Sequence, residues 1–287
     1  MTASPTGSSD GAGPEQTERL RLGGMALRNG LLIHGPTAWA IAARTPDGRI
    51  ESASGPKPSF APGRLGEIPM LRGPLRLAEA LAVIPLARAR LPAARLPFED
   101  RGVLAAVGLS LAASGMLRRG RSAEPSAAGA AAREAVVALL GTLPAVAALR
   151  DRDLASYHGV EHKAIGGYEV GADPAEVPKE HRRCGSNLIV PMLALSIAGQ
   201  VLLGRALDEP GPLARGLAGL AGVGAAVELF VHAERNPDSA VGRAVHGLGY
   251  EIQRLISTRD PTPEQLDVGR VALHEVLRAE AEAADTV

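Results

Sequence analysis

Aromatic residues are scarce in this chain of 287 residues, since Phe, Trp and Tyr together make up only 2% of it. The apolar fraction therefore depends on Ala, Leu and Val, accompanied by 34 glycines. An ordinary soluble domain fills more of its core with aromatic rings, whereas small residues suit close helix packing, including packing inside a bilayer. A genomic bias toward Ala, Gly, Arg and Pro explains the same numbers, so composition alone leaves the membrane question open.

An excess of either charge is also absent. The chain carries 31 basic and 31 acidic residues, which gives no electrostatic footprint for nucleic acid as a partner. Cys184 is the only cysteine, so an intrachain disulfide is excluded. Residues 1–16 contain no apolar run of the kind found in secretory signal peptides. Because they are rich in Gly, Ser, Pro and Thr, the segment 1–20 is expected to be a disordered tail.

Apolar stretches are the main feature that is present, and they predict a mainly α, helical integral membrane protein with about four short apolar helices. Spanning a bilayer takes roughly 20 residues, with a lower limit near 17. The last two stretches suit spans, since the third has no charge and the fourth has only Arg215 near its start and Glu228 with His232 near its end. The first two are short and Ala-rich, so each fits a span or a buried helix of a soluble bundle. The four stretches are 102–117, 135–149, 188–204 and 213–233.

Shorter elements are expected on both sides of these stretches. The pattern over 39–54, with a turn at 45–48, predicts a small N-terminal β-hairpin region. Residues 74–90 form an amphipathic pattern that suits a membrane surface, with an interruption near Pro85. Thr262 and Gln265 have the spacing of a capping box, which predicts a C-terminal amphipathic helix over 262–282. A single membrane domain over 21–277 follows from this organisation.

Four crossings would place the tail, the loop 150–187 and the C-terminal region on the same side of the membrane. Arginines are slightly more numerous on that side than on the other. By the positive-inside rule, the central polar loop is therefore expected on the cytoplasmic side.

His158, Glu161 and His162 form the pattern His-x-x-Glu-His. On a helix these positions lie on one face, so both imidazoles and the carboxylate can converge. That is the inverted zincin arrangement, in which two histidines hold a divalent transition metal, expected to be Zn²⁺. Glu161 would then act as the general base on a water molecule at the metal. Histidines hydrogen-bonded within a core are the alternative explanation.

A third ligand has three candidates: His181, Cys184 and Glu228. An ionisable group in an apolar stretch is costly unless it has a partner, which singles out Glu228. Lys163 and Arg183 would be free to stabilise developing negative charge, although Arg183 could instead anchor a helix at the headgroups. A site closed by His158, His162, His181 and Cys184 would favour a structural role. Glu228 with His232 also allows a weaker transporter hypothesis.

The order of four motifs resembles the YqhQ-like family of uncharacterised bacterial membrane proteins, also described as domain of unknown function 1385. The resemblance runs from about Leu22 to Leu277. It implies several membrane helices, a place in the bacterial inner (cytoplasmic) membrane and metal-dependent enzyme activity. The four motifs are Gly23-Gly24 with Gly30 and Gly35-Pro36, Tyr157-His158-Gly159-Val160-Glu161-His162-Lys163, His181-Arg182-Arg183-Cys184-Gly185-Ser186, and Ile256-Ser257-Thr258-Arg259-Asp260-Pro261.

The resemblance transfers to specific residues and has departures. His158, Glu161, His162, His181, Arg183 and Cys184 match motif positions, and Glu228 and Arg259 match more loosely. Where the family's first motif has Gln, Glu and Arg, this chain has Met25, Asn29 and His34, and Arg182 replaces a proline. These changes put substrate or metal binding by the first motif in doubt.

Beside the weaker transporter hypothesis, two main functional hypotheses follow from the sequence. The first is a membrane-bound metal-dependent hydrolase that uses the His-x-x-Glu-His site. The alternative is a non-catalytic membrane scaffold or assembly factor with a structural metal or hydrogen-bond site. The lipid bilayer is the only partner that the sequence indicates, and the substrate is not indicated.

Overall fold

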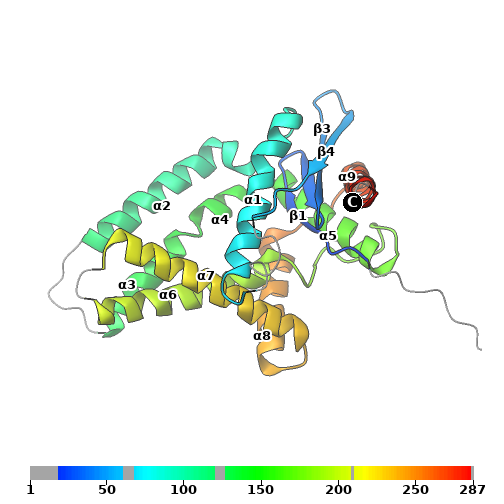
Figure 1. The fold of residues 1–287 in the computed structure, drawn as a ribbon. Coiled ribbons are helices and arrows are strands. Elements are labelled where there is room, and N and C mark those ends of the chain that lie inside the picture. Colours follow the sequence, from blue (N-terminus) through cyan, green and yellow to red (C-terminus); the bar gives the residue numbers. More distant parts are fainter. Residues whose placement is uncertain (1–18, 61–67, 120–126, 208–209, 286–287) are drawn as a thin grey trace, which may run out of the picture.

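A computed structural model describes residues 19–60, 68–119, 127–207 and 210–285. Except for residues 19 and 20, the expected disordered tail lies outside the described residues. The described chain is mainly helical with one small antiparallel sheet near its N-terminus, as Figure 1 shows. That part of the predicted fold class is confirmed.

The sheet has four antiparallel strands in the order β1-β2-β3-β4. The predicted hairpin is confirmed as β3 and β4, joined by a turn in which Gly48 has a φ of 86°. The strands β1 and β2 were not predicted. Gly30 lies in a strand where a Cβ would come within 2.0 Å of the Ala42 carbonyl oxygen. The strands are β1 Gly23–Ala26, β2 Gly30–His34, β3 Ala38–Arg44 and β4 Ile50–Pro56.

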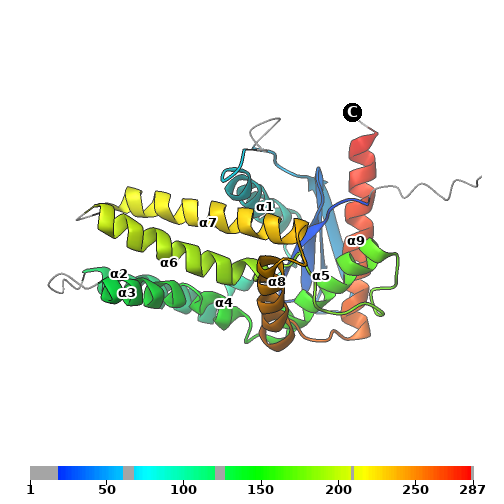
Figure 2. The same cartoon turned by 90° about the horizontal axis from the view of Figure 1, so that it is seen from below.

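Helices cover both faces of this sheet. Because successive side chains of a strand point to opposite faces, Leu31 and Ile33 pack with α5 (Arg152–Val170) and α9 (Pro263–Ala284), whereas Leu32 packs with α1 (Arg72–Arg90). Figure 2 shows the sheet between α1 and α9. The helix α1 runs through Pro85 without ending there, so the expected interruption is absent.

The C-terminal helix begins as predicted and is fastened to the sheet. Thr262 and Gln265 form the capping box, with N···O distances of 3.0 and 3.3 Å. Near the other end of α9, the buried carboxylate of Glu280 accepts hydrogen bonds from the backbone and hydroxyl of Thr37 and from the backbone of Ala38. The sheet and α9 therefore form one body.

Five helices extend from this body as a bundle, seen in Figures 1 and 2. The helix α6 packs against α7, α3 against α6, and α2 against α3 and α4. Arg118 on α2 forms an ion pair of 3.0 Å with the buried Glu134 on α3. The bundle helices are α2 Arg101–Arg119, α3 Ala127–Leu140, α4 Leu143–Ala148, α6 Ile189–Ala206 and α7 Pro212–Arg235.

In the described chain, three segments of this bundle are long and apolar enough to cross a membrane, not four. They are Ala131–Ala148, Gly185–Ala206 and Pro212–Arg235. The stretch 102–117 falls short because charged residues flank it closely, at Arg101 and at Arg118 with Arg119. Only 6%, 11% and 22% of the three apolar segments are buried within the protein. Their apolar surface faces outward, which is compatible with a membrane protein.

Short elements return the chain from the bundle to α5. The helix α8 (Ala240–Ile252) follows α7 and continues into one turn of π-helix, η4 (Gln253–Ser257). The backbone then crosses α5, where the Arg259 amide donates to the Ala155 carbonyl over 3.0 Å. A second short helix, η3 (Gly185–Leu188), contacts α8 and leads into α6. The segments at α5, η3 and η4 thus meet at one place.

Candidate metal centre

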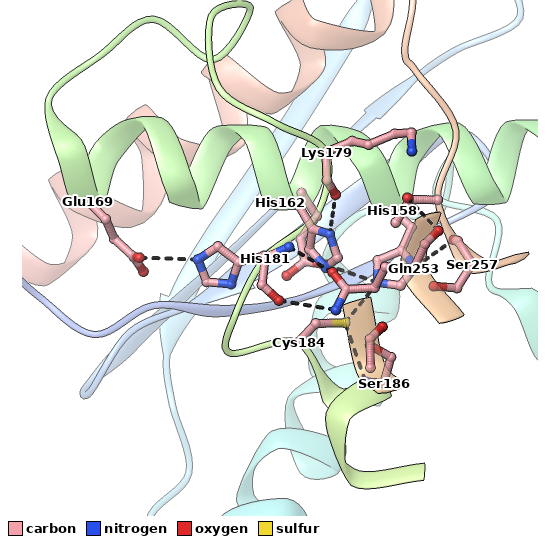
Figure 3. A network of polar contacts seen from close by, with 12 residues as sticks. His158, His162, Glu169, Lys179, His181, Cys184, Ser186, Gln253 and Ser257 are labelled. Carbon is pink, nitrogen blue, oxygen red and sulfur yellow. Dashed lines mark hydrogen bonds and ion pairs between the residues drawn. The ribbon is translucent and has the colours of Figure 1, made fainter. Parts of the chain in front are cut away.

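The helix α5 places the predicted motif on one face. Its start is capped by Asp151, whose carboxylate accepts from the backbone of Asp153 and Leu154, and its end by Gly171 with a φ of 74°. The rings of His158 and His162 have centroids 4.4 Å apart. One ligand atom from each of these histidines and from Cys184 lies within 4.8 Å of the other two. Figure 3 shows this cluster.

Backbone carbonyls fix both imidazoles. His158 Nδ1 lies 2.8 Å from the Ser257 carbonyl oxygen, and His162 Nδ1 lies 2.6 Å from the carbonyl oxygen of Lys179. A carbonyl oxygen can only accept, so each Nδ1 must carry the proton. In a neutral ring, Nε2 then presents its lone pair toward the cluster, which is the tautomer and orientation that metal-bound histidines use.

His162 Nε2 is buried and has no hydrogen-bond partner among the described residues. Burial, followed by the charge of His158, lowers the pKa of His162 to about 2. The ring is therefore neutral at pH 7, and its orphaned nitrogen costs about 1–3 kcal/mol unless a ligand satisfies it. A metal ion fits this position, because it would accept the lone pair that no protein group uses.

Cys184 supplies the third donor from the start of η3. Its Sγ lies 3.5 Å from His158 Nε2 and accepts from the Ser186 amide over 3.4 Å. Tetrahedral zinc with bonds of roughly 2.0–2.1 Å to nitrogen and 2.3 Å to sulfur separates those two ligand atoms by about 3.6 Å. Burial, with a smaller contribution from Glu161, raises the pKa of the Cys184 thiol to about 11. The donor set of two nitrogens and one sulfur suits a transition metal.

Glu161 lies beside the three donors rather than among them. Its Oε2 is 3.9 Å from the Nε2 atoms of both His158 and His162. The side chain is buried, and burial raises the pKa of this carboxyl, partly offset by His158. Strand β1 crosses it at Gly24, where a Cβ would lie 2.7 Å from Glu161 Cγ and 2.9 Å from Oε1. Gly24 therefore leaves the room that the carboxylate occupies, a role that the glycine motif alone did not reveal.

Three other predicted residues hold the loop that delivers Cys184. His181 Nε2 lies 3.1 Å from Glu169 Oε2, and Arg183 forms an ion pair with the same carboxylate. Lys163 Nζ donates to the carbonyl oxygens of Val177 (2.5 Å) and Ala175 (3.3 Å). None of the three joins the group of ligand atoms around His158. The spacing of seven residues from His162 to Glu169, two helical turns, was the signal that could have identified Glu169.

Gln253 is a buried residue of the site that no sequence motif indicated. Its Oε1 accepts from the His181 amide over 2.7 Å, and its Nε2 donates to the His181 carbonyl over 3.2 Å. These two bonds join η4 to the loop before Cys184, and Figure 3 shows them at the centre of the network. Nothing in the local sequence marks this residue, because its partner lies 72 positions away.

Glu228 is not brought to the cluster. Its Oε1 accepts from Arg72 Nε on α1 over 2.8 Å and from the Met70 amide over 3.1 Å. The ion pair therefore ties α7 to α1. It supplies the partner that an acidic group in an apolar helix requires, and it explains this carboxylate without a metal.

The altered residues of the first motif lie in β1, in β2 and in the turn between them. Asn29 makes three hydrogen bonds to backbone groups, at Arg44, Ala93 and Arg95. Burial and the nearby Lys57 lower the pKa of His34 to about 4, and Lys57 Nζ is 3.3 Å from its Nδ1. Met25 pairs with Leu32 within the strands. None of Met25, Asn29 and His34 contributes to the group of ligand atoms in the described chain.

Comparison with known proteins gives a match to a protein family. Residues 130–279 match the family described as "Protein of unknown function (DUF1385)". The match includes 150 of 287 residues, just over half of the chain, and contains His158, His162 and Cys184. Neither a curated protein nor a solved structure matches the chain.

Proposed function

Because the chain belongs to the DUF1385 family, whose description assigns no function, we propose from the site itself that this protein is a membrane-bound metal-dependent hydrolase. His158, His162 and Cys184 would hold the metal, for which zinc is the best fit. The observation that carries the proposal is the pair of carbonyl-fixed imidazoles whose Nε2 atoms converge with one thiol, His162 Nε2 having no hydrogen-bond partner among the described residues. The metal-dependent activity implied by the YqhQ-like resemblance is part of the same proposal.

The number of protein ligands favours catalysis over a purely structural metal. Catalytic zinc sites commonly use three protein ligands and keep a fourth position open, whereas structural sites use four. His181 is held by Glu169 and Glu228 by Arg72, so neither completes the set. At the open position the metal would act as a Lewis acid and lower the pKa of a bound water molecule.

Glu161 is placed to move the proton. Its Oε2 lies equally far, 3.9 Å, from the Nε2 atoms of both histidines, so it borders the space where the metal and substrate would meet. A buried carboxylate without a hydrogen-bond donor is a stronger base than an exposed one. Lys163 and Arg183 would act as positioning residues, because their hydrogen bonds and ion pair hold the loop before Cys184.

The same distances leave a second candidate, a scaffold with a closed structural site. If Glu161 moved the short distance needed to ligate, it would fill the fourth position with oxygen. Such a site has no place for substrate, and the protein would then be a membrane assembly factor. The two candidates differ in one property, the presence of an exchangeable fourth ligand.

Cobalt substitution separates these candidates. Co²⁺ loaded into the detergent-purified protein should give a thiolate charge-transfer band that disappears in Cys184→Ser. Added azide should shift the d–d spectrum, because an open position accepts an external ligand. The Ser186→Ala variant serves as control, since it keeps the thiolate. A charge-transfer band with a d–d spectrum that azide leaves unchanged would identify the closed structural site instead.

The packing of the sheet supports one proposed membrane topology. The sheet contacts α5 and α9, so these three elements lie on the same side of a bilayer. The helices α6 and α7 leave that side and return to it. Between the sheet and α5 the chain must therefore cross an even number of times. We propose that α2 and the α3–α4 segment enter as an antiparallel pair, although α2 alone lacks the composition of a span.

The ion pair between α2 and α3 supports insertion as a pair. Glu134 is buried and lies 3.0 Å from Arg118. An acidic group in an apolar helix needs such a partner, and α2 supplies it. We place the sheet, α5 and α9 on the cytoplasmic face of a bacterial inner membrane, as the arginine distribution predicts.

A further inference from the structure

A strongly basic pocket lies on the outer side of the segments that hold the candidate metal centre. Its volume is about 570 Å³. Residues from α5, from the loop before Cys184, and from η4 with the segment after it converge on it. The lining residues are Arg152, Ser156, Lys179, Arg254, Leu255, Ile256, Thr258, Arg259 and Asp260.

Cations outnumber anions in this lining by four to one. Two of the cations already have partners, because Arg254 pairs with Glu251 and Lys179 with Glu180, each at 2.7 Å. In the described part of the chain, the guanidinium groups of Arg152 and Arg259 have no ion pair or hydrogen bond. Asp260 is the one acidic residue of the lining, so the two unpaired guanidinium groups leave a positive charge that favours a bound anion. The planar fork of each guanidinium matches the oxygens of a phosphate.

Exposed apolar side chains border the same pocket. Leu255 is 66% exposed and Ile256 is 56% exposed, directly after Arg254. Basic groups that neutralise a headgroup, next to apolar groups that contact acyl chains, are the combination by which proteins recognise anionic lipids. We propose that this pocket binds a phosphate group, presented by a phospholipid headgroup or as free phosphate.

The pocket and the metal centre share backbone segments. The carbonyls that orient the two imidazoles belong to Lys179 and Ser257, and Lys179, Ile256 and Thr258 line the pocket. Figure 3 shows Lys179 with its carbonyl turned toward His162 and its side chain extending away from that hydrogen bond. A ligand in the pocket therefore contacts the segments that hold the metal ligands. The inference does not require that the protein be a hydrolase.

Binding is tested on the full chain, purified in detergent, with two probes. Inorganic phosphate is titrated at constant ionic strength, and its dissociation constant is taken from the rise of the unfolding temperature. In parallel, native mass spectrometry compares retention of phosphatidic acid with that of phosphatidylcholine. The test variant is Arg152→Gln, Arg259→Gln. The matched control is Arg76→Gln, Arg101→Gln, which removes two exposed arginines outside the pocket.

We expect the Arg152→Gln, Arg259→Gln variant to lose at least tenfold in affinity for one of these probes. The Arg76→Gln, Arg101→Gln control should change little. Stabilisation by inorganic phosphate would identify free phosphate as the source, and selective retention of phosphatidic acid would identify a headgroup. No response to either probe in the wild type, or an equal loss in both variants, would overturn the proposal. Metal content measured on the same samples keeps a failure of this pocket distinct from a failure of the metal centre.

Discussion

The Gly159→Ala variant is expected to lose about 2–3 kcal/mol of unfolding free energy, although alanine normally stabilises a helix interior. Gly159 lies on α5 next to His158, and a Cβ there would come within 2.3 Å of the Arg259 carbonyl oxygen. That oxygen belongs to the backbone, so the segment crossing α5 must move. Its displacement would also disturb the Ser257 carbonyl that orients His158.

The matched control is Gly166→Ala on the same helix. There a Cβ would meet only His181 Cδ2 at 3.7 Å and a Val177 methyl at 3.9 Å, which is ordinary contact. This variant should therefore gain about 0.5–1 kcal/mol from helix propensity. Denaturant unfolding in mild detergent measures both. Equal shifts in the two variants would show that the segment does not press against α5 at Gly159.

Cysteine labelling is expected to give an all-or-none contrast between the two ends of the bundle. Pro46→Cys in the hairpin turn, Glu176→Cys in the loop after α5 and Ala281→Cys on α9 should react with a membrane-impermeant maleimide from the cytoplasmic side only. Leu207→Cys, at the end of α6, should react from the opposite side only. All four positions are exposed, whereas the native Cys184 is buried, so unsubstituted protein is the control for background labelling.

The physical reason for this pattern is the packing of the sheet against α9. The Glu280 carboxylate on α9 accepts hydrogen bonds from the backbone amides of Thr37 and Ala38. These residues are therefore in direct contact, so α9 and the sheet must lie on the same side of the bilayer. Intact cells and inverted vesicles give the two accessibilities. Labelling of Pro46→Cys and Ala281→Cys from opposite sides would contradict the paired insertion of α2 with α3–α4 and the packing on which it depends.

Local sequence patterns were sufficient to predict the features that depend only on residues close together in the chain. The His158, Glu161 and His162 spacing predicted a shared helix face, and the structure has them on α5. The capping box at Thr262 and the β3–β4 hairpin were likewise predicted from neighbouring residues. In each case a helical or strand period, or a turn, determines the geometry.

Features that depend on distant packing could not be predicted. The carbonyls of Lys179 and Ser257 that fix the imidazoles are backbone groups and leave no trace in residue type. Glu228 was a candidate ligand because an ionisable group in an apolar helix needs a partner. Its actual partner, Arg72, lies 156 positions away, so the sequence did not reveal the ion pair. The first motif did not reveal that Gly24 lies in a strand that crosses Glu161. The periodicity of apolar residues predicts single helices and strands, but it does not indicate which of these elements pack against each other.

Metal content is the measurement that tests the central claim most directly. Elemental analysis of the detergent-purified wild type should find about one equivalent of a transition metal, with zinc the best fit, as expected for a site of two histidines and one cysteine. The His158→Ala, His162→Ala variant should contain none, while a His232→Ala, His274→Ala control, outside the group of ligand atoms, should keep the metal. Absence of metal from the wild type even after reloading, or its retention in the first variant, would contradict the metal centre.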